Sequence, residues 1–347
     1  MLIASLKGLK AKNTDLAKYW QENAISVDPL QVFDITGKGG WFVGSPAEFL
    51  LKKKIETNGK PLKDWDIKIN YGIKTGLNEA FIIDTATKER LCQQDPKSAE
   101  IIKPILRGRD IKRYGYKWAD LWVIGTFPAL KLNIDNYLAI RQFLTDFGKD
   151  RLEQSSKTLS DGTKSRKKTG NKWFETQDQI GYYKEFQKEK VVWAESGYQK
   201  FAFAPSGIFL DKTLFMIVGN NLKYIMAVCN SKIGKYIFDY STPDLGSTGN
   251  CMTKQTVETI PIPLLDTPEK QDLAKQIEAL VNEILRVKNV AETTVFPKKT
   301  QTKLNINGDA TNGDMVVAST EHLEVQIDQL VYQLYDLTEE EIKTIQK

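Results

Sequence analysis

Histidine is almost missing from this chain, since His322 is the single example among 347 residues. It stands at the polar start of an expected helix, where a surface position is the ordinary interpretation. Cysteine is scarce as well, and Cys92, Cys229 and Cys251 are far apart and odd in number. That spacing predicts neither a disulfide framework nor a zinc site. The scarcity argues against catalysis by a histidine-assisted nucleophile.

Long apolar runs are also missing. No stretch of about 18 apolar residues occurs, so no membrane-spanning helix is expected. The apolar start of residues 1–7 is too short for a secretory signal. The content of 41% hydrophobic and 27% charged residues is ordinary for a soluble globular protein. We therefore expect a cytoplasmic protein without a membrane partner.

What the chain does have is clustered positive charge. The formal net charge is only +5, so its distribution matters more than its sum. Residues 157–173 hold six cations against one acid, without apolar periodicity, and their Gly and Ser predict a flexible loop. Such a loop suits contacts with phosphates, and a merely solvated loop is the alternative. The candidate residues are Lys164, Arg166, Lys167, Lys168 and Lys172.

A second candidate site follows a strand-like alternation at Asp66–Tyr71. A Gly-bounded polar turn leads from it to the apolar run Ala80–Ile83, which fits a hairpin or a strand-to-strand loop. The turn offers Lys74, Thr75 and Asn78 as possible contacts to DNA. Lysine suits phosphates, and asparagine can pair with adenine.

Arginines next to a glycine form a third candidate. Arg107 and Arg109 flank Gly108, and arginine can bind guanine through two hydrogen bonds. An internal ion pair, for example with Asp110, explains them equally well.

A polar, glycine-rich stretch over residues 241–250 is the last candidate. Ser247, Thr248 and Asn250 could approach a DNA backbone, because their glycine neighbours permit close contact. Turn formation alone is an equal explanation.

The periodicity of the whole chain predicts an α+β fold. Extended runs at 121–124, 190–193, 201–203, 207–210 and 214–218 indicate a mixed sheet or half-barrel. Helices are expected from Ser45, from Asp135 to about Phe147, and over 221–240, where Ser231 caps a second segment. Apolar stripes after Thr267 and Glu321 predict a C-terminal helical pair. We divide the chain into a lead-in segment (1–60), a recognition domain (61–265) and a helical arm (266–347).

Two of these stretches carry a family resemblance. The residues NYGIKTGLNEAFIID (70–84) and SAEIIKPILRGRDIKRYGY (98–116) resemble the TaqI-like C-terminal specificity domain. This is the target-recognition part of type IIG restriction–modification enzymes, which fuse an adenine-N6 methyltransferase to an endonuclease. The order LKYIMAVCNSKIGKYIF, a small-residue loop, TIPIPLL and a long helix is similar to the end of such a domain. The tail IDQLVYQLYDLTEEEI resembles the same enzymes.

The resemblance implies a module that recognises a specific sequence of double-stranded DNA. The tetrapeptide Asn/Asp-Pro-Pro-Tyr/Phe of adenine methyltransferases does not occur here, so no catalytic residue is assigned. S-adenosylmethionine and Mg²⁺ are implied only for catalytic domains outside this chain, in the same parent protein or in a separate subunit.

Two alternatives remain open. The chain could be a protein–protein adaptor in a phage-defence assembly that keeps the specificity-domain fold. It could also be an enzyme in its own right, although no catalytic constellation supports this.

Overall fold

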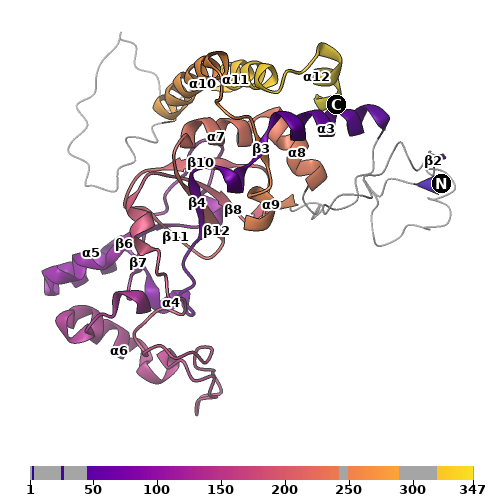
Figure 1. Ribbon diagram of the computed structural model, residues 1–347. Coiled ribbons are helices and arrows are strands. Elements are labelled where there is room, and N and C mark those ends of the chain that lie inside the picture. The colour runs from indigo at the N-terminus through magenta and orange to yellow at the C-terminus, as the bar shows by residue number, and fades with distance from the viewer. Residues whose placement is uncertain (1, 4–24, 27–44, 242–248, 289–318, 347) are drawn as a thin grey trace, which may run out of the picture.

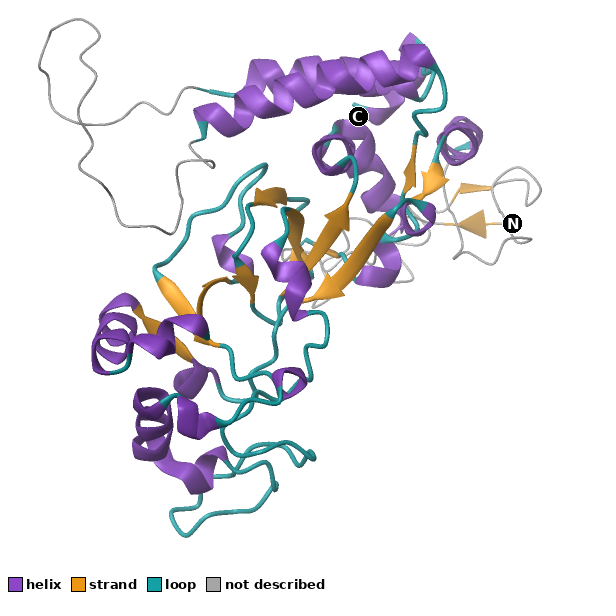
Figure 2. Cartoon of the chain, turned by 60° about the vertical axis from the view of Figure 1, so that its left-hand side comes forward, coloured by secondary structure: helices purple, strands orange, loops and turns teal. Residues whose placement is uncertain are grey.

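The computed structural model describes residues 2–3, 25–26, 45–241, 249–288 and 319–346. Helices gather at two opposite ends of the molecule, with the strands between them (Figures 1 and 2). Among the described residues, no helix is long and apolar enough to cross a membrane. The fold is α+β, as the periodicity predicts.

The first sheet has four strands in the order β10-β8-β12-β4, all antiparallel. Its strands are β4 (Ile67–Tyr71), β8 (Lys190–Ala194), β10 (Phe201–Ala204) and β12 (Leu214–Gly219). Each coincides with an extended run that the sequence predicts. In the register Phe215 lies opposite both Trp193 and Tyr71, and its ring is 5.2 Å from that of Trp193.

The second sheet is mixed, with the order β11-β6-β7-β5. Its strands are β5 (Ile82–Asp84), β6 (Ile102–Leu106), β7 (Leu121–Ile124) and β11 (Phe209–Leu210). β7 is antiparallel to β5 and β6, whereas β11 is parallel to β6. The mixed sheet among our two expectations is therefore the one observed.

Two hydrophobic cores lie on the two faces of this mixed sheet. The smaller core, which defines the small lobe, includes Ile83, Ile102, Trp122 and Ile124. The larger core, which defines the large lobe, includes Val123 and Phe209. Alternation along β7 thus sends Trp122 and Ile124 to one core and Val123 to the other, because successive side chains of a strand point to opposite faces.

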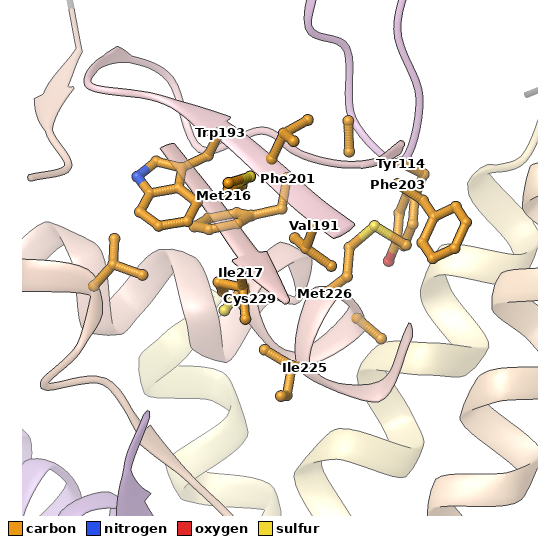
Figure 3. Packing of buried hydrophobic residues seen from close by; sticks show 14 of the residues in the cluster. Tyr114, Val191, Trp193, Phe201, Phe203, Met216, Ile217, Ile225, Met226 and Cys229 are labelled. Atoms are coloured by element: carbon orange, nitrogen blue, oxygen red, sulfur yellow. The ribbon is translucent and has the colours of Figure 1, made fainter. Parts of the chain in front are cut away.

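The large-lobe core continues from the first sheet into helices. α7 (Leu222–Asn230) and α8 (Lys232–Ser241) are joined at Ser231, whose Oγ accepts from the amide of Gly234, so the expected cap is confirmed. Figure 3 shows Ile225, Met226 and Cys229 of α7 beneath side chains of the sheet. Seven consecutive residues of α7 are buried.

The C-terminal helical pair consists of α10 (Pro268–Val287) and α11 (Glu321–Leu334), followed by α12 (Glu339–Ile345). Lys288, just after α10, pairs with Glu324 in the first turn of α11 at 3.7 Å, so the two helices run in opposite directions. Their side chains Ile277, Val281, Ile327 and Val331 belong to the large-lobe core. α3 (Pro46–Asn58) begins after Ser45, as predicted, and Ser45 and Glu48 form a capping box there.

The remaining strands have two residues each, and the remaining α-helices range from four residues to fifteen in α6. They are the strands β1 (Leu2–Ile3), β2 (Ile25–Ser26), β3 (Lys60–Pro61), β9 (Ser196–Gly197), β13 (Asn250–Cys251) and β14 (Pro261–Ile262), and the helices α4 (Asn78–Phe81), α5 (Thr85–Gln94), α6 (Leu138–Leu152) and α9 (Lys254–Val257). The strands pair antiparallel as β1–β2, β3–β14 and β9–β13. The predicted boundaries at residues 60 and 265 stay predictions.

Two local expectations are corrected. β4 and the apolar run after it do not form a hairpin, because β4 pairs with β12 and β5 pairs with β7 in the other sheet. The strand-to-strand loop is the alternative observed. Asp135 does not cap a helix, since it lies in a short 3₁₀ turn (Ile134–Asn136) held by the side chain of Asn133. The helix α6 begins three residues later, at Leu138.

Candidate nucleic-acid interface

The turn after β4 is fixed by its backbone. The amide of Gly72 donates to the carbonyl of Leu214, and that of Ile73 donates to the carbonyl of Leu210. A Cβ on Gly72 would lie 1.8 Å from the carbonyl oxygen of Asp211, so only glycine allows this approach. Lys74 follows directly and is exposed. The predicted cation is therefore presented from a rigid base.

Thr75 and Asn78 lie in the same turn with different roles. Thr75 is 1% exposed, and its hydroxyl donates to Asn78 Oδ1 at 2.7 Å while accepting from the amide of Leu77. The Thr75 hydroxyl is thus occupied within the turn. Asn78 is exposed, and because its Oδ1 accepts from Thr75, its amide nitrogen is the group left to donate outward.

The cationic segment extends from α6 as a long loop with its own hydrogen bonds. The amides of Ser156, Leu159 and Ser165 donate across the loop to the carbonyls of Arg166, Thr163 and Lys157. We call residues 156–168 the cationic hairpin. The expected flexible loop is corrected to this extent: facing backbone groups pair, and buried Ser165 Oγ accepts from the amide of Lys157 at 2.8 Å.

The lysines of this segment are exposed to solvent, as the sequence predicts for a charged loop. Lys164, Lys167 and Lys168 lie on the cationic hairpin, and Lys172 follows it; all four are exposed. Lys172 Nζ lies 5.6 Å from the centroid of the Phe174 ring. These side chains supply a row of donors suited to phosphate oxygens.

Arg166 differs from its lysine neighbours because it is only 4% exposed. Its guanidinium donates to four backbone carbonyls, those of Leu152, Thr75, Glu175 and Trp173, at 2.6–3.0 Å. Desolvation lowers the pKa of Arg166 to about 10, so the group stays charged at neutral pH. These bonds leave Arg166 a role inside the protein, and we do not include it among the outward-facing cations.

The turn and the cationic hairpin are brought together in space. Arg166 joins them through the Thr75 carbonyl, and the amide of Asp178 donates to the carbonyl of Lys74 at 3.3 Å. Burial raises the pKa of Asp178, while the charges of Lys74 and Lys167 act against that rise. The Asp178 carboxylate therefore interacts electrostatically with one lysine from each of the two predicted sites.

The two predicted arginines separate. Arg107 forms a two-bond pair with Asp110, at 3.1 Å from Nε and 2.9 Å from Nη2, and this bond raises the pKa of Arg107. Asp110 is 5% exposed. The internal ion pair, one of our two interpretations, is thus present at Arg107. Arg109 is exposed, and its side chain makes no ion pair with any residue in the described part of the chain.

Two further cations lie near the turn that contains Arg107 and Arg109, which we call the arginine corner. They were not singled out from the sequence. The amide of Lys117 donates to the Asp110 carbonyl at 2.7 Å, and exposed Lys212 precedes Thr213, whose hydroxyl accepts from the amide of Gly108 at 3.0 Å. Lys117 is exposed as well. Their proximity to Arg109 arises from contacts between distant segments, so no sequence signal marks them.

The last predicted site is partly described. Ser247 and Thr248 lie outside the described residues. Asn250 is half-buried in β13, which pairs with β9. Gly249 has φ +87°, and a Cβ there would lie 2.4 Å from the Gly197 carbonyl carbon. Glycine thus allows the close approach of two backbones of this chain.

Groups suited to metal binding do not gather anywhere in the described ranges. No cluster of at least three His, Cys, Asp or Glu residues could hold a metal there. His322 is exposed on α11. Burial raises the pKa of the Cys229 thiol to about 12, which keeps it protonated and unreactive.

Part of this chain matches a known protein family. Residues 103–262 match the model of the TaqI-like C-terminal specificity domain. The chain carries a TaqI-like specificity domain. Its matched residues include both corner arginines, the cationic hairpin and Asn250. The turn with Lys74, Thr75 and Asn78 precedes the match, yet Arg166 of the specificity domain binds its backbone.

Two solved restriction enzymes are similar in structure to this chain. The type IIL restriction-modification enzyme MmeI, solved in complex with DNA, is 12% identical, with a TM-score of 0.51 over 82% of this chain and 35% of its own. The type IIG restriction endonuclease BpuSI is 13% identical, with a TM-score of 0.44 over 84% of this chain and 34% of its own. The chain therefore spans about a third of the length of either enzyme. No curated protein sequence matches it.

Proposed function

We propose that this chain is the sequence-specific double-stranded DNA recognition module of a type IIG-like restriction–modification protein. The observation that carries the proposal is the row of four exposed lysines on and beside the cationic hairpin, inside a specificity domain. MmeI, which shares the fold, is a restriction-modification enzyme solved in complex with DNA. The work of the chain is binding, and bond-making belongs to other domains.

The proposed contacts divide into two kinds. Lys164, Lys167, Lys168 and Lys172 would contact phosphates, which fix the position of a protein on the duplex without reading its sequence. Asn78 and Arg109 are the candidates for base contacts, because Asn78 offers its amide nitrogen and the exposed Arg109 makes no ion pair within the described part of the chain. Each good two-bond contact to a base gives about 1–3 kcal/mol of discrimination.

Catalysis would come from domains that this chain does not include. An adenine-N6 methyltransferase and an endonuclease would use S-adenosylmethionine and Mg²⁺, and they would belong to the same parent protein or to a separate subunit. This chain would hold the duplex so that the target adenine meets that methyltransferase. A cytoplasmic location follows from such a substrate.

Fluorescence anisotropy with random duplexes at 50 and 200 mM salt tests the phosphate contacts. We expect affinity to fall steeply with salt, because each neutralised phosphate contributes about −0.9 to the slope of log K against log salt. The triple variant Lys164→Ala/Lys167→Ala/Lys168→Ala should make that slope shallower by about 2.7. A matched control removes three exposed lysines elsewhere, Lys63, Lys275 and Lys343, and should leave the slope unchanged.

Selection from a pool of random duplexes tests sequence specificity. We expect one short motif to be enriched, and the Asn78→Ala or Arg109→Ala variant should relax one position of it. Absent or salt-independent binding would contradict the proposal and favour the protein–protein adaptor. Binding without any enriched motif would contradict specificity while leaving DNA binding intact.

A further inference from the structure

We propose that Arg166 is a positioning residue for DNA binding, which acts by fixing the cationic hairpin against the 72–78 turn rather than by touching DNA. The proposal rests on the proposed function and deepens it. It assigns the one cation of the segment that is withdrawn from solvent to the support of its exposed neighbours.

The contacts of Arg166 join three separate pieces of chain. Leu152 ends α6, Thr75 belongs to the turn, and Trp173 and Glu175 follow the cationic hairpin. Four of the five N–H groups of a guanidinium are thus used by backbone carbonyls. At most one N–H group is left for another acceptor, and the 4% exposure of the residue keeps a phosphate away.

The surroundings of the guanidinium are shaped to receive it. Its central carbon lies 5.0 Å from the centroid of the Phe81 ring, an arrangement that stabilises a cation. Gly76 has φ +84°, and a Cβ there would approach the Cδ of Arg166 to 3.3 Å. The glycine of the turn thus leaves room for the arginine of the cationic hairpin.

A lysine could not replace these contacts. The ammonium group is a compact point charge, whereas the planar guanidinium reaches separate acceptors in fixed directions. Arg166→Lys keeps the positive charge but loses the planar guanidinium and its donors in fixed directions. It therefore separates a role in positioning from a role as one more phosphate contact.

Other bonds at the base of the cationic hairpin should keep the variants folded. The Thr169 hydroxyl donates to Gln154 Oε1 at 2.6 Å, and Gln154 Nε2 donates to the carbonyls of Lys172 and Glu175. Loss of the arginine should therefore loosen the hairpin locally.

Trypsin cleavage within the hairpin tests the positioning without any DNA. Lys164, Lys167 and Lys168 are cleavage sites in wild type and in both Arg166 variants. We expect Arg166→Lys and Arg166→Gln to accelerate cleavage there about tenfold, because lost hydrogen bonds to a charged group raise the population of open hairpin. The control Arg141→Lys changes an exposed arginine of α6 and should leave the rate unchanged. Unchanged cleavage in both Arg166 variants would overturn the proposal.

A double-mutant cycle tests the consequence for DNA. In the wild-type background, we expect Arg166→Lys to weaken binding about tenfold and to reduce the salt slope by more than the single contact value of about 0.9. In the background that lacks Lys164, Lys167 and Lys168, the same change should alter affinity by no more than about twofold, since Arg166 acts through those lysines. An equal loss in both backgrounds, or full affinity of Arg166→Lys, would overturn it.

Failure of the proposed function and failure of the Arg166 proposal would give different results. Wild-type protein that binds no DNA would contradict the proposed function, while the trypsin experiment would still test the hairpin anchor. If circular dichroism shows that both Arg166 variants are unfolded, Ser165→Ala serves as a further variant. It removes the hydrogen bond between the Lys157 amide and Ser165 Oγ within the hairpin and leaves the charge unchanged. We then expect faster cleavage and weaker DNA binding from Ser165→Ala, and wild-type behaviour in both would overturn the proposal.

Discussion

Lys190 donates from its ammonium group to the carbonyl oxygen of Pro205 at 2.9 Å. The lysine begins β8 and is 0% exposed. Desolvation lowers its pKa to about 7, against the opposing effect of Glu189. A charged amine in this place is a cost to the folded state, because burial without a paired carboxylate disfavours the ion.

The stability of the protein should therefore depend on pH through Lys190. Above pH 10.5, the ordinary pKa of a lysine side chain, the amine is neutral in both the folded and the unfolded state. As the pH falls from there, the unfolded chain takes up a proton that the folded protein refuses, so stability falls until about pH 7, where the folded lysine also protonates. Lys190→Met should be more stable than wild type by about 4 kcal/mol at pH 7, with a smaller difference at pH 10.

Urea unfolding at pH 7 and 10 measures this difference. Lys184→Met, an exposed lysine before the same strand, serves as the control and should show no such dependence. A Lys190→Met effect that is identical at both pH values would contradict the explanation.

Glu324 of α11 fastens the helical pair to the segment after η3 (Gly108–Asp110). It pairs with Arg113 and with Lys288, whose Nζ also donates to the Arg113 carbonyl at 3.0 Å. Glu324→Gln should lower the free energy of unfolding by about 1–3 kcal/mol, because it leaves two half-buried cations without their carboxylate. Exposed Glu321, one turn earlier, gives a control variant, Glu321→Gln, expected to be neutral in chemical denaturation.

Gly72 and Gly170 should respond in opposite ways to alanine. Gly72→Ala places a Cβ 1.8 Å from the Asp211 carbonyl, whereas a Cβ on Gly170 would meet no atom within 4 Å. We expect Gly72→Ala to cost at least about 3 kcal/mol and Gly170→Ala to stay within about 0.5 kcal/mol of wild type. Thermal unfolding of both variants measures this, and equal midpoints would show that the turn adapts.

Arg107 and Arg109 should separate stability from DNA binding. Arg107→Ala leaves buried Asp110 without its partner and should cost about 1–3 kcal/mol of stability. Arg109→Ala should weaken DNA binding while the unfolding midpoint stays that of wild type. Parallel denaturation and anisotropy measurements on the two variants check this contrast, which fails if Arg109→Ala is the less stable one.

The local elements of the fold were accessible from the sequence. Alternation predicted β4, extended runs predicted β7, β8, β10 and β12, and Ser45 and Ser231 marked helix starts with side-chain caps. These signals are local, because period and capping depend on residues a few positions apart. The strand partners were not predictable in this way, since the parallel pairing of β6 with β11 joins segments about a hundred residues apart.

The candidate site was accessible in part for a related reason. The exposed lysines 164, 167 and 168 were predicted as a charged cluster, and Arg166 looked identical to them in the sequence. Its burial depends on the carbonyls of Thr75 and Leu152, and carbonyls leave no mark on the sequence because every residue has one. Lys190 was hidden likewise at the start of an apolar strand.

The mixed sheet, with a hydrophobic core on each face, acts as a bulkhead between the lobes. A rotation of one lobe against the other would disturb the packed side chains on both faces of this sheet. Close-packed interiors resist such deformation. We therefore expect the distance between the lysines of the cationic hairpin and the cations around Arg109 to change little when DNA binds. A double helix that binds this protein would have to fit that distance between the two groups of cations. DNA sequences that bend easily to fit it should be favoured, even at base pairs that no side chain touches.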